Sequence, residues 1–305
     1  MPGPAFDITA EKRATIRHFL YRQLCVTPPL PRGVDLRGKT AIVTGANGGL
    51  GLECARQLLD LGLSKLIIAV RNESKGQAAR RDLFSGRDMD DDAIEVWELD
   101  LLHYDSIMYF VKRVENDVQR LDIVVLNAGI WQHHYEVAPT GHENTIQVNV
   151  LSTALLMILL LPTFVKTNTL VQEPSRVVAV SSDIASWAKF KEQGSDLLLP
   201  ALDKPEAFSM PDRYCTSKLL GQLFVAEFVK RIPSSVAVVN MPNPGMCYGT
   251  SLGHDGGGFL NALAAIPIRA LGRSSAVGAR CLIDAAVNHG KDSHGQYVED
   301  GKLQP

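Results

Sequence analysis

Two residues with complementary acid–base chemistry, Tyr214 and Lys218, lie four positions apart in the segment PDRYCTSKLLGQLF. Positions i and i+4 share one face of a helix, so the phenol and the amine can point into the same cleft. A carbonyl that accepts a hydride at carbon needs a proton at oxygen, and a phenol can donate one. Because a free phenol has a pKa near 10, we expect the nearby amine to lower the pKa of Tyr214. A half-exposed helix face with no chemistry is the alternative.

A glycine-rich stretch, TGANGGLG at residues 44–51, is a candidate binding site for a dinucleotide. It follows a β-branched strand candidate and opens a helical segment. In that context, spaced glycines let the backbone approach a pyrophosphate at the N-terminus of a helix. A tight turn with a purely structural role is the alternative. The residues expected to contact the cofactor at this turn are Gly45, Asn47, Gly49, Leu50 and Gly51.

The residue after the second strand candidate bears on the choice between the two nicotinamide dinucleotides. NAD sites often place an acid there to bind the ribose, whereas an arginine accommodates the 2′-phosphate of NADP. This chain has Arg71, with Glu73 two positions further on. We therefore favour NADP(H) over NAD(H), with a surface role for Arg71 as the alternative. After the third strand candidate, Asp100 and Leu101 are expected beside the adenine, although an acid at position 100 also suits a helix cap.

The segments that must position these residues alternate between short apolar runs and helical stretches. Continuous apolar runs are typical of parallel strands that are buried on both faces. The alternation predicts a doubly wound α/β sheet in one domain over residues 36–305, preceded by an N-terminal helical extension over residues 1–35. The strand candidates span residues 40–44, 65–70, 93–99, 122–127, 176–182, 235–240 and 296–300.

Three regions depart from this alternation. In the extension, Ile16, Phe19, Leu20 and Leu24 have helical spacing among basic residues. We expect this helix to pack on the domain, with contact to a membrane surface through residues 12–25 as the alternative. The stretches 183–211 and 249–260 are predicted to be long loops, which serve either as active-site lids or as surface decoration.

Composition narrows the functional classes. The chain of 305 residues is 46% hydrophobic with a formal net charge of −2, which argues against a nucleic-acid-binding surface. Five scattered cysteines form no CxxC pair, so we expect no metal site and no disulfide framework, in a reducing, cytoplasmic location. The apolar run VLSTALLMILLLP is too short to span a bilayer and is predicted to be a buried or interface helix.

Taken in order along the chain, TGANGGLG, NAG at 127–129, Asn149, the serines at 181–182 and Tyr214-x-x-x-Lys218 resemble the short-chain dehydrogenase/reductase family over about residues 36–305. Within the family, the chain is most similar to the retinol-dehydrogenase-like and fungal reductase branches. The resemblance implies a seven-stranded parallel Rossmann sheet and hydride transfer between a nicotinamide and a carbonyl or alcohol. The catalytic residues that it implies are Asn149, Ser182, Tyr214 and Lys218.

The resemblance implies further roles at the cofactor. The segment Asn127, Ala128 and Gly129 would line the floor of the cofactor site, and Pro244 and Gly245 would flank the nicotinamide. Two implied roles concern proton transfer: Asn149 would hold a water that links Lys218 to solvent, and Ser182 would bind the substrate oxygen. Ser182 lies 32 positions before Tyr214, farther than is usual in the family, so the intervening residues must loop out.

We therefore expect an NADP(H)-dependent oxidoreductase that acts on a carbonyl or alcohol of a hydrophobic small molecule. A secondary-metabolite carbonyl and a retinoid-like alcohol are both open, as is the direction of reaction. The alternatives are a non-redox epimerase or dehydratase on the same fold, and an NADP(H)-binding regulator without catalysis. Many relatives pair through helices near 140–165 and 211–231, so a homodimer is an option. Candidates for the substrate pocket wall are His133, His134, Trp187, Phe190, Met246 and Tyr248.

Overall fold

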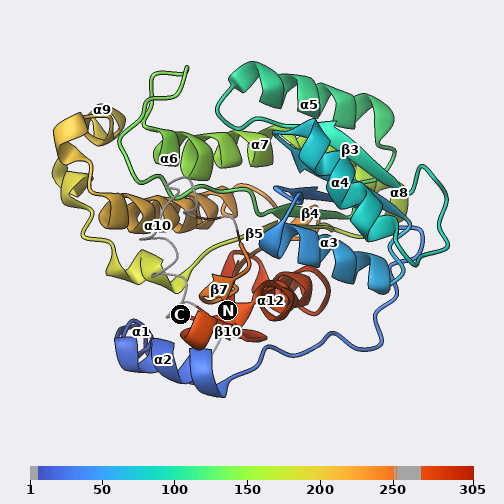
Figure 1. The fold of residues 1–305 in the computed structure, drawn as a ribbon, viewed down its shortest axis with the longest axis horizontal. Coiled ribbons are helices and arrows are strands. Elements are labelled where there is room, and N and C mark those ends of the chain that lie inside the picture. The colour runs from blue at the N-terminus through green and yellow to red at the C-terminus, as the bar shows by residue number, and fades with distance from the viewer. Residues whose placement is uncertain (1–5, 251, 253–268) are drawn as a thin grey trace.

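Eight strands form the central sheet of the computed structural model, which describes residues 6–250, 252 and 269–305 (Figure 1). Their order across the sheet is β10-β9-β6-β5-β4-β1-β2-β3. The order reverses between β1 and β4, and at such a point the connections leave in opposite directions and open a crevice at the carboxyl ends of the strands. The strands are β1 (Thr40–Thr44), β2 (Lys65–Val70), β3 (Ile94–Glu98), β4 (Ile123–Leu126), β5 (Ser175–Ala179), β6 (Ala237–Asn243), β9 (Gln296–Glu299) and β10 (Lys302–Gln304).

The predicted doubly wound sheet of seven parallel strands is confirmed. Strands β1 to β6 and β9 all pair in parallel, and each overlaps a strand candidate of the sequence. Strand β10, which was not predicted, pairs antiparallel with β9 at the edge of the sheet. It is reached through a tight turn in which Asp300 and Gly301 both have positive φ, and it is too short to give an alternating pattern.

Helices cover both faces of the sheet (Figure 1). One layer buries Leu58, Leu83 and Leu282 against the strands, and the other buries Phe110 and Phe164. Continuous apolar strands require this arrangement, because both of their faces must be removed from water. The first layer contains α3 (Gly49–Asp60), α4 (Glu73–Phe84) and α12 (Ser275–Val287), and the second contains α5 (Tyr104–Asp117), α7 (Thr153–Leu159), α8 (Leu161–Val171) and α10 (Met210–Phe228).

The segment that enters α7 is irregular. Helix α6 (Asn144–Ile146) continues through a π-helical turn at Gln147–Ser152 before the regular helix resumes. No single helix among the described residues is long and apolar enough to cross a membrane. The helical segments Asn144–Leu159 and Leu161–Val171, which are bent by 40° against each other, reach the required length and composition only when they are taken together.

The two stretches predicted as loops differ in outcome. Residues 183–211 contain short helical turns at Asp183–Trp187, Lys191–Gly194 and Pro205–Ala207, together with α9 (Leu198–Leu202). Most of the stretch 249–260 lies outside the described residues. On either side of it, β7 (Cys247–Tyr248) and β8 (Arg273–Ser274) form a small parallel pair.

The N-terminal segment forms α1 (Ala10–Arg13) and α2 (Ile16–Cys25), which lie beside β7 and β10 (Figure 1). Of the apolar residues with helical spacing, Ile16, Leu20 and Leu24 are exposed and do not pack on the domain. Helix α2 buries Arg22 and Gln23 instead. Electrostatics explain the reversal, because three carboxylates of the main body bind the guanidinium of Arg22. The boundary between an extension and a domain near residue 35 stays a prediction.

Phe110 provides a test of the layer that covers the second face of the sheet. Its side chain is 1% exposed and packs edge-on against Trp97, with ring centroids 5.8 Å apart. Phe110→Ala should lower the free energy of unfolding by about 3–5 kcal/mol, because it leaves a cavity in a packed core. Urea denaturation measures the change. Leu170→Ala, at a side chain that is 61% exposed, should change stability by about 0.5 kcal/mol or less; equal effects of the two substitutions would contradict the packing described.

Candidate active site

A cavity of about 990 Å³ lies at the carboxyl ends of the parallel strands. It brings together segments that are far apart in the sequence, from the glycine turn after β1 to the turn after β6. Gly51 and Asn149 are the predicted site residues that do not border it. Those that do are Gly45, Asn47, Gly49, Leu50, Arg71, Asp100, Leu101, Asn127, Ala128, Gly129, Ser182, Tyr214, Lys218, Pro244 and Gly245.

The glycine turn is built for close backbone approach. Gly45 has φ +68°, and a Cβ atom on it would lie 3.0 Å from the Cα of Ala128. Gly51 does not border the cavity. It allows close packing, because a Cβ there would lie 2.6 Å from the side-chain nitrogen of Asn127. Asn127 fastens the turn to β4, since its Nδ2 donates to the carbonyl oxygen of Thr44 at 2.9 Å.

The N-terminus of α3 faces this cavity without a side-chain cap. Gly48 occupies the N-cap position and offers no side-chain hydrogen bond, while Gly48, Gly49 and Leu50 all border the cavity. The first N–H groups of a helix have no intrahelical acceptor and attract anions. The turn therefore fits a pyrophosphate, as its sequence predicted.

Arg71 and Asp100 lie at the ends of β2 and β3. Arg71 is exposed and borders the cavity, while Glu73 belongs to the first turn of α4. Asp100 also borders the cavity, and its Oδ1 accepts a hydrogen bond from the N–H of Leu102 at 2.9 Å. Asp100 does not cap α5, whose N-cap is His103 without a side-chain hydrogen bond, so its expected place beside the adenine stays a prediction.

Tyr214 and Lys218 occupy the first turns of α10, which begins at Met210 with Pro211 in its first turn. The hydroxyphenyl group is buried, at 7% exposure, and Lys218 is partly buried. The amine nitrogen lies 5.8 Å from the centroid of the Tyr214 ring and donates to the carbonyl oxygen of Val180 at 3.0 Å. The predicted helix face is therefore formed, with both side chains bordering the cavity.

The expectation that Lys218 lowers the pKa of Tyr214 is wrong for the protein alone. Burial raises the pKa of the Tyr214 phenol, and negative charge at Cys215 and Asp183 adds to this effect. Burial also lowers the pKa of Lys218 to about 8. Desolvation outweighs charge pairing here, because it disfavours phenolate and ammonium alike.

Trp131 covers one face of the Tyr214 ring. The two rings are parallel within 4°, with centroids 4.9 Å apart, and the indole Nε1 donates to the sulfur of Met210 at 2.8 Å. Trp131 lies two positions after the NAG segment, in the stretch that also carries the pocket-wall candidates His133 and His134. Its stacking on Tyr214 was not predicted, because that contact depends on the tertiary fold.

The two serines after β5 have different partners. The hydroxyl of Ser182 donates to Asp183 Oδ1 at 3.3 Å and accepts from the N–H of Ile184. The hydroxyl of Ser181 accepts from the side-chain amide of Gln222 at 2.8 Å. Both serines border the large cavity, so the predicted choice of Ser182 stays a prediction.

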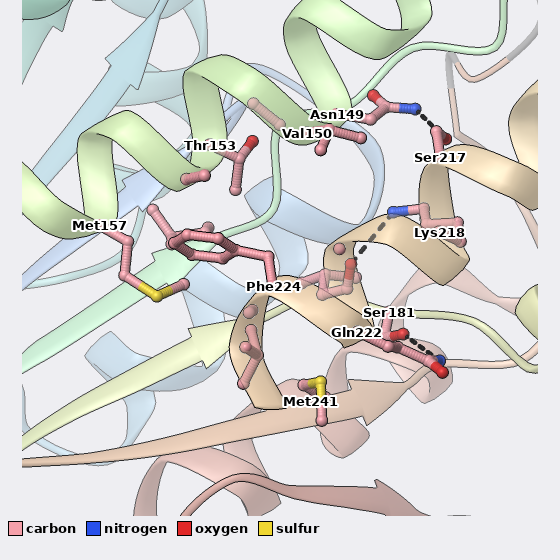
Figure 2. A pocket seen from close by; sticks show the side chains of 17 residues that line it. Asn149, Val150, Thr153, Met157, Ser181, Ser217, Lys218, Gln222, Phe224 and Met241 are labelled. Carbon is pink, nitrogen blue, oxygen red and sulfur yellow. Dashed lines mark hydrogen bonds between the residues drawn. The ribbon is translucent and has the colours of Figure 1, made fainter. Parts of the chain in front are cut away.

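A second, smaller cavity of about 40 Å³ lies behind Lys218 (Figure 2). Thr153, Ser181, Ser217 and Lys218 are among the polar side chains that line it. This volume suffices for at least one water molecule. The small cavity therefore gives the Lys218 amine polar neighbours on the side away from the large cavity.

Asn149 lines the small cavity, but its side chain is directed elsewhere than expected. Its Oδ1 accepts from the N–H of Ile130 at 2.9 Å. Its Nδ2 donates to the carbonyl oxygen of Ile130 and to Ser217 Oγ, the latter visible in Figure 2. The side chain thus ties the π-helical turn to the segment after β4, and the predicted role of Asn149 in holding a water beside Lys218 stays a prediction.

Four of the six remaining candidates for the substrate wall border the large cavity. These are His133, Trp187, Met246 and Tyr248, and Phe19 and Met210 border the cavity as well. His134 and Phe190 are not among its lining residues. No cluster of three or more metal-ligating side chains occurs within the described part of the chain. Burial raises the pKa of the Cys247 thiol to about 12, so this cavity-lining cysteine is not activated.

Comparisons with known proteins agree with this geometry. A family model of short chain dehydrogenases matches residues 39–192. The chain is 48% identical over 308 residues to the short-chain dehydrogenase fogG of Aspergillus ruber, covering 98% of this chain and 88% of that protein. In fold it is similar to the carbonyl reductase Sniffer of D. melanogaster, with a TM-score of 0.63 and 19% identity over 87% of this chain and 97% of the other. It is also similar to a protein described as a short chain dehydrogenase of Shigella flexneri complexed with NADP, with a TM-score of 0.58 and 22% identity over 88% and 98% of the two chains.

The lowered pKa of Lys218 gives a pH-dependent test of the site. Between pH 8 and 10.5 the unfolded chain binds more protons at this lysine than the folded chain, so its contribution to stability rises with pH. Lys218→Met should therefore be more stable than the wild type at pH 7, and this advantage should shrink by about 1–2 kcal/mol towards pH 9.5. Urea denaturation at the two pH values measures it. Lys230→Met, at an exposed lysine, is the control, and an advantage that does not change with pH would contradict the burial of the amine.

Proposed function

The chain belongs to the short chain dehydrogenase family, and on that premise we propose that it is an NADP(H)-dependent oxidoreductase. It transfers hydride between the nicotinamide and a carbonyl or alcohol of a hydrophobic small molecule, with Tyr214 as the general acid and base. One observation carries the proposal: a single cavity is lined by the glycine turn, by Pro244 and Gly245, and by the Tyr214 and Lys218 pair.

The cofactor-binding half of the cavity supports NADP(H). The uncapped N-terminus of α3 would bind the pyrophosphate, and the segment Asn127, Ala128 and Gly129 would form the floor beside the ribose. Arg71 is exposed at the end of β2, where a guanidinium can reach a 2′-phosphate. The related protein of Shigella flexneri is described as complexed with NADP, which accords with this preference.

When bound, the nicotinamide supplies or accepts the hydride, and the residues of this chain handle the proton. The raised pKa keeps Tyr214 protonated at neutral pH, so the phenol can donate to the oxygen of a carbonyl that is being reduced. Ser182, at the rim of the same cavity, would bind that oxygen and hold it within reach of the phenol. These features favour carbonyl reduction over alcohol oxidation.

Lys218 would have two roles, one in stabilising charge on Tyr214 and one in proton transfer. A partly buried ammonium favours a nearby phenolate, and so would stabilise Tyr214 after it has lost its proton. Lys218 would pass a proton towards the tyrosine, and a water in the small cavity behind the amine would then return a proton to Lys218. Asn149 would support this path by holding the π-helical turn in place through Ile130 and Ser217.

The substrate half of the cavity supports a hydrophobic, aromatic molecule. Phe19, Trp131, Trp187 and Met210 provide aromatic and thioether surface around Tyr214. A flat ring system next to the Trp131 and Tyr214 stack would extend the aromatic contacts already present. Within this class we favour a secondary-metabolite carbonyl, and the fungal relative of 48% identity is likewise named a short-chain dehydrogenase.

The role of Tyr214 can be tested with Tyr214→Phe. This change removes the proton donor and keeps the ring that stacks on Trp131, so turnover should fall by about 10²–10⁴-fold while NADPH still binds. Loss of nicotinamide absorbance with phenanthrenequinone reports turnover, and NADPH fluorescence reports binding. Tyr109→Phe, at an exposed tyrosine, is the control.

Two results would contradict this proposal. Full activity in Tyr214→Phe would exclude the phenol as the proton donor. Tight NADPH binding by the wild type, with no net consumption across a panel of carbonyls, would instead favour a non-redox enzyme or a regulator on the same fold.

The preference for NADP(H) over NAD(H) can be tested at Arg71. Arg71→Ala should weaken NADPH binding relative to NADH binding by about tenfold to a hundredfold, because a charge-assisted hydrogen bond to phosphate is lost. Titration of fluorescence with each reduced cofactor gives the ratio of dissociation constants. Arg81→Ala, at another exposed arginine of the α4 region, should leave the ratio unchanged; an unchanged ratio in Arg71→Ala would rule out its contact with the 2′-phosphate.

A further inference from the structure

Helix α2 buries two polar side chains against the protein and exposes several of its apolar side chains to solvent. Arg22 and Gln23 are 3% and 8% exposed, whereas Ile16 and Leu24 are 67% and 60% exposed. Polar groups are buried at a cost unless they are hydrogen-bonded. The helix must therefore be held by specific polar contacts, and these contacts lead to the active site.

Gln23 fastens the turn after β6 in two directions. Its Nε2 donates to the carbonyl oxygen of Met246 at 3.0 Å and to that of Leu271 at 3.1 Å. Its Oε1 accepts from the N–H of Met246 at 3.0 Å. Gly245, beside it, has φ +74°, and a Cβ there would lie 2.3 Å from Gln23 Oε1. One amide thus fixes both backbone groups of the residue that follows Pro244 and Gly245.

Arg22 connects α2 to the segment that carries Ser182, the serine proposed to bind the substrate oxygen. Its guanidinium forms ion pairs with Glu299 at 2.7 Å, Asp300 at 2.8 Å and Asp183 at 3.2 Å. The other oxygen of Asp183 accepts from the hydroxyl of Ser182 at 3.3 Å. The path from α2 to the serine therefore consists of one ion pair and one hydrogen bond.

A third contact places α2 at the substrate end of the cavity. Phe19 borders the cavity and packs edge-on against Trp187, with centroids 5.6 Å apart. The indole nitrogen of Trp187 in turn donates to the carbonyl oxygen of Ala14, just before α2, at 2.8 Å. The helix and the segment after β5 thus form one wall.

Arg273 completes the attachment from the other side. Its Nη2 donates to the carbonyl oxygens of Arg22 and Val26 at the end of α2, at 2.9 and 3.0 Å. Its Nη1 forms an ion pair with Asp300 at 2.7 Å. A cation at the C-terminus of a helix stabilises its last carbonyls, so the register of α2 against the site is fixed at this end.

We propose that α2 is a positioning element of the active site, in which Gln23 holds the turn that flanks the nicotinamide and Arg22 holds the segment that carries Ser182. The inference rests on the proposed function, because it assigns these two residues to the geometry of hydride transfer. Neither is a catalytic residue, since each acts through another group. The adenosine half of the cofactor site, at the glycine turn, is independent of both.

The test compares three variants of the full-length chain. Gln23→Met keeps the size of the side chain and removes both amide groups. Arg22→Lys keeps a positive charge and removes the planar fork, and so tests the second arm without leaving the acids unpaired. Arg17→Gln, at an exposed residue of the same helix, is the control. Each is assayed for NADPH binding by fluorescence, for turnover of phenanthrenequinone and for its midpoint of thermal unfolding.

Gln23→Met and Arg22→Lys should each lower kcat by about tenfold to a hundredfold, because small displacements of reacting groups have effects of that size. The dissociation constant of NADPH should be little changed, and Arg17→Gln should match the wild type. A folded Gln23→Met variant with wild-type kcat would overturn the proposal, as would a loss of NADPH binding equal to the loss of kcat. A wild type that binds NADPH without turnover would instead count against the proposed function itself.

If Gln23→Met fails to fold, Arg22→Lys decides the outcome. A folded Arg22→Lys variant with wild-type kcat would then overturn the proposal, and the expected fall in kcat at unchanged NADPH affinity would support it.

Discussion

Desolvation of the Lys218 amine is the constraint on which the rest of the site depends. Helix α10 places this amine behind Tyr214, and the carbonyl oxygen of Val180 accepts one of its protons. No carboxylate among the residues that the structure describes forms an ion pair with it. A cation in that position is stabilised by whatever oxygen-rich group enters the cavity. In the function proposed above, the bound cofactor and the phenolate that forms at Tyr214 during turnover would balance the charge of Lys218.

The fold makes this arrangement from segments that are distant in the chain. The carboxyl ends of β1, β4, β5 and β6 meet where the strand order reverses, and each contributes a turn to one cavity. Asn127 ties the first of these turns to the second, through its hydrogen bond to Thr44. Gln23 and Arg22 tie the last two to α2. Specific polar contacts, two of them hydrogen bonds to the backbone and one an ion pair, therefore connect the turns around the site.

Much of this could be predicted from the sequence, because the relevant signals are local. Continuous apolar runs identified seven strands, and the spacing of Tyr214 and Lys218 identified a shared helix face. Strand β10 was missed, since three residues at a sheet edge carry no periodic signal. The orientation of α2 was predicted wrongly, because the interactions that set it are not local in the sequence. Its apolar spacing is a clear local signal, but the partners of Arg22 lie more than 160 positions away.

The sign of the shift at Tyr214 was also beyond a local reading. An amine four positions away suggested a lowered pKa, whereas the stacked ring of Trp131 and the surrounding chain bury the phenol and raise it. Burial is a property of the assembled fold, and it outweighs one neighbouring charge when both partners lose water together.

The most direct test is an NMR titration of the lysine amines in the cofactor-free protein, with Lys218→Met used to assign the signal of Lys218. The site described here predicts a pKa for Lys218 of about 8. A pKa near the ordinary lysine value of 10.5 would show that the amine remains fully hydrated, and would contradict the account of how the site is poised.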